Sequence, residues 1–90
     1  MDSIYKYQLE IDDEQILTLP AKAAILTVQV LDNVPHLYAV VDLDTEETEE
    51  RHILTFGTGH LIEDNLKAHY IGTYKVHDNK GVFHVFEKVR

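Results

Sequence analysis

Six carboxylates lie within nine residues of this chain, and no basic residue is among them. They are Asp42, Asp44, Glu46, Glu47, Glu49 and Glu50. The whole chain has 16 acidic and 8 basic residues and a net charge of −8, whereas without this run it would have 10 acidic and 8 basic residues. Carboxylates at this density can dock a basic partner, bind a divalent cation or simply keep a loop solvated.

The three interpretations of the acidic run differ in what they require. As a docking surface it would bind a basic protein, and a second acidic cluster could join it if both turns lie at one end of the fold. That cluster is Glu10, Asp12, Asp13 and Glu14. Full DNA mimicry is not expected, because duplex DNA carries one charge per ~1.7 Å and six carboxylates along about 30 Å of extended chain fall short. A calcium loop is disfavoured because Glu47 stands where the helix–loop–helix motif needs glycine.

The tetrapeptide Gly57-Thr58-Gly59-His60 is the best candidate for a small-ligand site. Closely spaced glycines let backbone N–H groups converge on a phosphate or carboxylate, and Thr58 and His60 offer further donors. The aromatics Tyr70, Tyr74 and Phe86 could complete such a site. The tetrapeptide has no P-loop lysine, however, and a tight corner between strands would use the same glycines.

Metal binding and catalysis have little support. None of the six histidines has the spacing of a paired metal ligand, and there is no cysteine. We expect His84 to be a core histidine bonded to a backbone carbonyl. Ser3 is the single serine and lies near the start of the chain, so no serine triad is credible. The sequence therefore predicts a protein that is not an enzyme and uses no metal or cofactor.

Alternation with a period of two indicates that strands must position these residues. The expected strands are residues 4–11, 15–19, 23–31, 36–41, 51–56, 70–77 and 81–89. In the third strand, Leu26, Val28 and Val30 should face inward. Asp32-Asn33 predicts one hairpin turn and residues 78–81 another, with Gly81 at its positive-φ position.

This pattern predicts an all-β or β-rich α+β fold. We expect a small antiparallel barrel or two packed sheets of six or seven strands, with at most one short helix near residues 61–69. Ninety residues enclose one core, so residues 1–90 should form a single domain.

Composition also constrains location and partners. There is no secretory signal at the start and no stretch of 18 apolar residues, so we expect a cytoplasmic protein. A net charge of −8 argues against binding nucleic acid or anionic membranes directly. Free sheet edges would make a symmetric homodimer the commonest association.

Several stretches, in this order and spacing, resemble a family of short proteins encoded by bacteriophages and prophages, grouped as a domain of unknown function. The resemblance runs from about Ile4 to Glu87. It is carried by residues 5–9, 24–30, 57–60, 70–73 and 82–87, of which Gly-Thr-Gly-His and Phe-His-Val-Phe-Glu are the most specific. It implies a phage accessory gene and a compact fold, and it assigns no catalytic residue.

Together these observations favour a non-enzymatic, phage-type accessory protein that binds and modulates a host protein through the acidic run. An inhibitor of a host defence effector, such as a CRISPR complex, would fit the size and charge. The alternative is a nucleotide- or phosphate-binding protein that uses Gly57–His60. A virion or assembly component is a third hypothesis.

Overall fold

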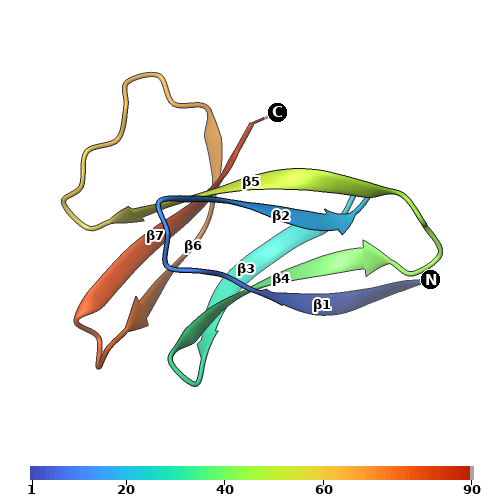
Figure 1. Ribbon diagram of the computed structural model, residues 1–90, viewed down its shortest axis with the longest axis horizontal. Helices are drawn as coiled ribbons and strands as arrows, with labels where there is room; N and C mark the ends of the chain where they lie inside the picture. Colours follow the sequence, from blue (N-terminus) through green and yellow to red (C-terminus); the bar gives the residue numbers. More distant parts are fainter. Residues whose placement is uncertain (90) are drawn as a thin grey trace.

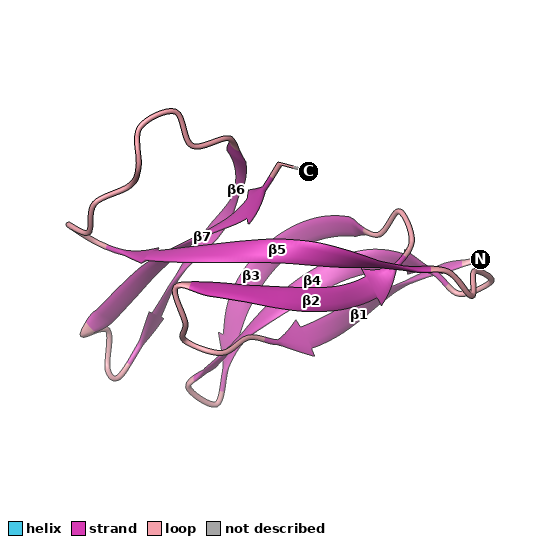
Figure 2. Cartoon of the chain, turned by 45° about the horizontal axis from the view of Figure 1, so that its top comes forward, coloured by secondary structure: helices cyan, strands magenta, loops and turns pink. Residues whose placement is uncertain are grey.

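The computed structural model describes residues 1–89 as seven β-strands in two sheets, and these residues contain no helix. Every strand pair is antiparallel. The three-stranded sheet has the order β1-β4-β3, and the four-stranded sheet has the order β2-β5-β7-β6 (Figures 1 and 2). The strands are β1 (Asp2–Gln8), β2 (Glu14–Pro20), β3 (Ala24–Leu31), β4 (Val34–Asp42), β5 (Thr48–Gly57), β6 (Ala68–Val76) and β7 (Gly81–Lys88). This confirms the all-β prediction in its two-sheet form, since the sheets do not close into a barrel.

Both predicted hairpins are present. In the β3–β4 hairpin, Asp32 and Asn33 have φ values of 50° and 63°, as a two-residue turn with both central residues left-handed requires. β4 is the centre of its sheet.

Gly81 was predicted to hold the positive-φ position of the second hairpin turn, and this was wrong. The positive-φ residues of the β6–β7 turn are His77, Asp78 and Asn79. Gly81 instead begins β7, where a Cβ would lie 2.9 Å from the ring of Phe83. Close packing, and not turn conformation, explains the glycine.

The helix considered for residues 61–69 does not form. Residues 58–67 make an irregular connection that leaves β5 beside one end of β7 and enters β6 beside the other end. The connection must therefore cover the length of β7. A helix of one or two turns rises only 1.5 Å per residue and would be too short for this. Asn65, with φ of 63°, also interrupts any helical conformation.

Leu26 does not face inward, because the pairing register of β3 with β4 shifts between Ile25 and Thr27. This bulge turns Leu26 outward, where 49% of its surface is exposed, while Val28 is buried. A second bulge interrupts β6 between Tyr70 and Gly72. Gly72 follows it, and there a Cβ would lie 2.9 Å from the side chain of Val28.

The core lies between the two sheets. Its fully buried side chains come from both sheets and from the β1–β2 connection, and the largest are Leu9, Leu19, Leu37, Ile53, Val41, Val76 and Val85. One ion pair is enclosed with them: the Arg51 guanidinium donates twice to the Glu87 carboxylate, once at 2.9 Å, and its third nitrogen donates to the carbonyl of Ala23 at 2.8 Å. The hydrogen bond to Glu87 raises the pKa of Arg51. These contacts join β5 and β7 to Ala23, the residue just before β3.

The two sheets leave the molecule thin and open. Its Cα extents are 41 × 34 × 15 Å, and its accessible surface is 6101 Å². A compact monomer of 10.4 kDa would expose about 5,400 Å². The described residues contain no helix long and apolar enough to cross a membrane.

Candidate functional site

The acidic run does not form one loop. Asp42 ends β4, residues 43–47 form the connection, and β5 already begins at Thr48 and not at Arg51. Because side chains alternate along a strand, Glu49 and Glu50 point to opposite faces of the sheet. Glu49 accepts a hydrogen bond from the backbone N–H of Lys22. The exposed carboxylates of the run are therefore those of Asp42, Asp44, Glu46, Glu47 and Glu50.

Hydrogen bonds give the connection a defined shape. The Asp44 N–H donates to the Asp42 carboxylate at 2.9 Å, and the Glu47 N–H donates to the Thr45 hydroxyl at 3.2 Å. The carbonyl of Glu47 accepts from Ala21 at 2.9 Å. Asp44 also lies 2.6 Å from the amino group of Met1, and this bond raises the pKa of that group. The carboxylates are thus displayed by an ordered segment.

A hollow of about 390 Å³ adjoins this segment on the outer face of the three-stranded sheet. It is lined by Asp2, Ala21, Lys22, Ala24, Val40, Asp42, Thr45 and Glu47. Asp2 and Asp42 are paired residues of β1 and β4. The hollow thus combines three carboxylates and one ammonium with small apolar side chains. Such a site suits an arginine or lysine side chain, whose aliphatic part packs while its charge meets carboxylates.

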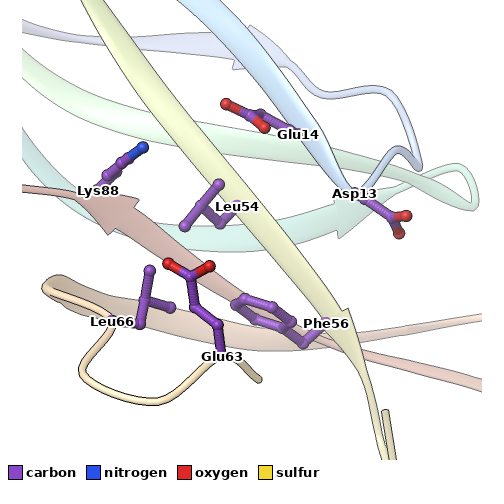
Figure 3. Close-up of a pocket in the computed structure, with 7 residues that line it drawn as sticks. All are labelled: Asp13, Glu14, Leu54, Phe56, Glu63, Leu66 and Lys88. Atoms are coloured by element: carbon purple, nitrogen blue, oxygen red, sulfur yellow. The ribbon is translucent and has the colours of Figure 1, made fainter. Parts of the chain in front are cut away.

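The second acidic cluster lies at the opposite end of the β2–β5 strand pair. In the register of β2 with β5, Glu14 pairs with Leu54, whereas the acidic run adjoins Pro20 and Thr48. The two clusters therefore do not merge. The second cluster adjoins another hollow, of about 260 Å³, lined by Asp13, Glu14, Leu54, Phe56, Glu63, Leu66 and Lys88 (Figure 3).

The Gly57–His60 tetrapeptide is a corner at the end of β5. The His60 N–H donates to the carbonyl of Gly57 at 3.0 Å, and the Thr58 N–H donates to Val82 of β7 at 3.3 Å. Gly59 has φ of 87°, and a Cβ on Gly57 would lie 2.7 Å from the His60 ring. The corner therefore needs glycine at position 59 for its backbone conformation, whereas a side chain at position 57 would require the exposed His60 ring to move. Because two of its amides are already bonded, the tetrapeptide has fewer N–H groups to offer an anion.

The corner nevertheless borders a hollow of about 400 Å³ on the outer face of the four-stranded sheet. Its lining comes from the corner and the following loop, and from β5, β6 and β7: Phe56, Gly57, Thr58, Gly59, His60, Ile62, Tyr70, Thr73, His84 and Phe86. Tyr70 and Phe86 thus join the tetrapeptide as the sequence suggested. Tyr74 does not, because it faces the core and is 3% exposed.

His84 is not the core histidine that we expected. Its Nε2 lies 2.7 Å from the hydroxyl of Thr58, and its Nδ1 lies 2.9 Å from the hydroxyl of Thr73. The Thr73 hydroxyl in turn lies 2.6 Å from that of Tyr70. Both imidazole nitrogens therefore bond to side chains, and no backbone carbonyl is involved.

Sequence reasoning missed Phe56, Ile62, Thr73 and His84 as members of this hollow. For Thr73 and His84 the signal lies in the hairpin register, which pairs Tyr70 with Phe86 and Thr73 with His84. Counting back from the turn finds the second pair, but the bulge after Tyr70 shifts the first by one residue. Among residues 1–89 no group of three potential metal ligands lies together.

Comparison with known proteins adds a family and no function. Neither the curated proteins nor the solved structures contain a match to this chain. A family model matches over the full length, residues 1–90. The chain belongs to the family described as "Domain of unknown function (DUF7352)".

Proposed function

We propose that this protein is a non-enzymatic binding protein that recognises a partner protein with a basic surface through its acidic end. We define the acidic end as Asp2, Asp42, Glu46, Glu47 and Glu50 together with the adjoining hollow. The observation that carries the proposal is this hollow of about 390 Å³, where three carboxylates and the single ammonium of Lys22 surround small apolar side chains beside an ordered segment.

The charges at the acidic end favour binding more than folding. At 4 Å, two opposite charges attract by about 1 kcal/mol in water and about 4 kcal/mol at the effective dielectric of a protein surface. A basic side chain that enters the hollow displaces water, so its attraction to the carboxylates there is stronger than it would be in water. Without such a partner the carboxylates repel one another, in part offset by Lys22 and by the Asp44 N–H, and this repulsion slightly destabilises the fold.

The exposed surface is also consistent with a binding protein. The accessible surface of 6101 Å² exceeds that of a compact monomer of this mass by about 700 Å². A standard protein interface takes about 800 Å² from each partner. The surplus is therefore slightly smaller than one partner's share of such an interface, but of the same order.

The finer proposal is a phage-type accessory protein that modulates a host protein in the cytoplasm, as an anti-defence inhibitor would. It is supported by the resemblance of residues 57–60 and 82–87 to phage-encoded proteins and by the small, acidic chain. A basic partner that normally holds nucleic acid, such as a CRISPR complex, would present the complementary surface.

Affinity capture with two matched variants tests the proposal. The first variant is Asp42→Asn/Glu46→Gln/Glu47→Gln/Glu50→Gln, which keeps Asp44 and Glu49 because both carboxylates make contacts within the fold. The control is Glu10→Gln/Asp12→Asn/Asp13→Asn/Glu14→Gln, which removes the same formal charge at the opposite end. Each variant is used as bait in a lysate of the host bacterium, beside the unmodified chain.

We expect the first variant to lose its partner and the control to keep it, with unchanged circular dichroism spectra for both. Equal capture by all three proteins would contradict the proposal. Loss only in the control would move the binding surface to the opposite end.

A further inference from the structure

A second site lies on the outer face of the four-stranded sheet, away from the acidic end. It is the hollow of about 400 Å³ between the 57–62 segment and strands β6 and β7, and it will be called the aromatic hollow. Its volume falls in the range of about 300–1,000 Å³ that is typical of small-molecule sites. None of its residues belongs to the acidic end, so a ligand bound here does not depend on the proposed function.

We propose that the aromatic hollow binds an uncharged nucleoside, or the base of one. The base would stack on Tyr70, and its polar edge would bond to the chain of hydroxyl and imidazole groups that begins at Tyr70 and ends at Thr58.

The stacking surface is exposed and held in place. Tyr70 is 60% exposed, although its ring contacts Phe86 edge to face at 5.4 Å between centroids. Phe86 contacts Phe56 in the same manner at 5.8 Å. Three rings from adjacent strands thus support one another, and the outermost stays open to a ligand. Exposure on this scale for a large aromatic ring costs free energy that a stacked base would recover.

The hydrogen-bond chain has one proton more than it needs internally. It runs Tyr70–Thr73–His84–Thr58 through contacts of 2.6, 2.9 and 2.7 Å. Three hydroxyls and a neutral imidazole supply one proton each, and the three contacts use all but one of them. When each group donates to the next one along the chain, in either direction, one end of the chain donates outward and the other end accepts. A ligand with both donors and acceptors around a flat ring matches this arrangement, and nucleosides have both.

The surroundings select against a charged ligand. No lysine or arginine is among the residues that line the aromatic hollow. The His60 N–H is bonded within the corner, and the Thr58 N–H is bonded to the carbonyl of Val82 in β7. The chain as a whole carries a net charge of −8, which repels phosphate groups and nucleic acid. Lys80 lines an adjoining hollow that shares Gly57, Thr58 and His60, and it is the candidate cation for a charged ligand.

Titration of the ¹⁵N-labelled chain with adenosine, guanosine, cytidine, uridine and thymidine, each to millimolar concentration, tests the inference by NMR. We expect at least one of them to shift the amide resonances of Thr58, Thr73 and His84 along a saturable curve. If none of the five moves these resonances, or if the shifts lie elsewhere on the molecule, the inference is wrong.

Variants identify the contacts. Tyr70→Ala should weaken the binding roughly 5- to 150-fold, as expected for loss of one stacked base. Tyr5→Ala is the matched control, because Tyr5 is an exposed tyrosine of β1 in the other sheet, 48% exposed, and it should change nothing. Thr73→Val should weaken binding about 2- to 10-fold by interrupting the chain, and Thr73→Ser should restore it. Equal effects of Tyr70→Ala and Tyr5→Ala would overturn the stacking.

Comparing a nucleoside with its 5′-monophosphate distinguishes an uncharged ligand from a phosphate-bearing one. The nucleoside 5′-monophosphate should bind no more tightly than the nucleoside itself. Tighter binding of the monophosphate that disappears in Lys80→Ala would contradict the choice of an uncharged ligand. The acid-neutralised variant of the acidic end should bind the nucleoside as the unmodified chain does, which keeps the two proposals experimentally separate.

Discussion

Tyr74 faces the core with its hydroxyl enclosed, and the hydroxyl has no hydrogen-bond partner in the part of the chain that the structure describes. An unsatisfied buried hydroxyl costs about 1–3 kcal/mol. We therefore expect Tyr74→Phe, which keeps the ring against Phe83, to raise the free energy of unfolding by about 1 kcal/mol in urea denaturation. A decrease of similar size would show that the hydroxyl is bonded in solution.

The same substitution should alter the alkaline pH dependence. Burial raises the pKa of Tyr74 above its ordinary value of 10, so the unfolded chain loses this proton first as pH rises. Stability from this group is complete below about pH 10 and falls above it. Tyr74→Phe should lose less stability than the unmodified chain between about pH 9 and 11. Parallel pH profiles would contradict the assignment.

Arg51 and Glu87 make a nearly buried pair, and their side chains are 9% and 13% exposed. Removing one partner leaves the other charge enclosed without compensation, which typically costs about 3–5 kcal/mol. Arg51→Met should therefore destabilise the protein by about 3 kcal/mol. The double variant Arg51→Met/Glu87→Leu should recover most of this loss, because it removes both charges. A double variant at least as unstable as the sum of both single variants would refute this account.

Among the elements, β3 and β6 come together because Gly72 has no side chain. A Cβ there would lie 2.9 Å from the buried side chain of Val28, closer than such atoms normally approach. We expect Gly72→Ala to cost about 1–3 kcal/mol through overpacking, measured by thermal and urea unfolding. Gly72→Ala/Val28→Ala should be less destabilised than the separate effects imply. Additive losses would show that the two residues do not clash.

The elements also show what the sequence could predict and what it could not. Alternation and the Asp32-Asn33 turn sufficed for the β3–β4 hairpin, because both signals depend on neighbouring residues. The bulges at Leu26 and Ile71 were missed, because an extra residue in a strand depends on which strands pack across the core. The sequence allowed at most one short helix in the connection from β5 to β6 and could not decide whether it forms, since sheet order determines how far this connection must reach.

The candidate sites, too, could be predicted where the signal came from neighbouring residues and not where it depended on how the strands pack. The acidic run could be found from composition, but β5 begins inside it and sends Glu49 and Glu50 to opposite faces. The aromatic hollow was anticipated only in part, because it joins residues from three strands and a loop. Tyr74 was misplaced for the same reason, since the bulge in β6 decides which tyrosine faces the core.

Across the whole molecule, the antiparallel pairing of β2 with β5 places the acidic end and the second acidic cluster at opposite ends of that strand pair. A thin sandwich with Cα extents of 41 × 34 × 15 Å keeps these surfaces separate. The aromatic hollow lies on the outer face of the four-stranded sheet, whereas the hollow of the acidic end lies on that of the three-stranded sheet. A macromolecule and a small ligand could therefore be bound at the same time.

Amide hydrogen exchange of the chain with and without its captured partner tests the central claim most directly. The account predicts slower exchange on complex formation in residues 21–24 and 40–50, with little change in residues 10–16 and 70–86. Protection of the latter segments, with the acidic end exchanging as in the free chain, would contradict it.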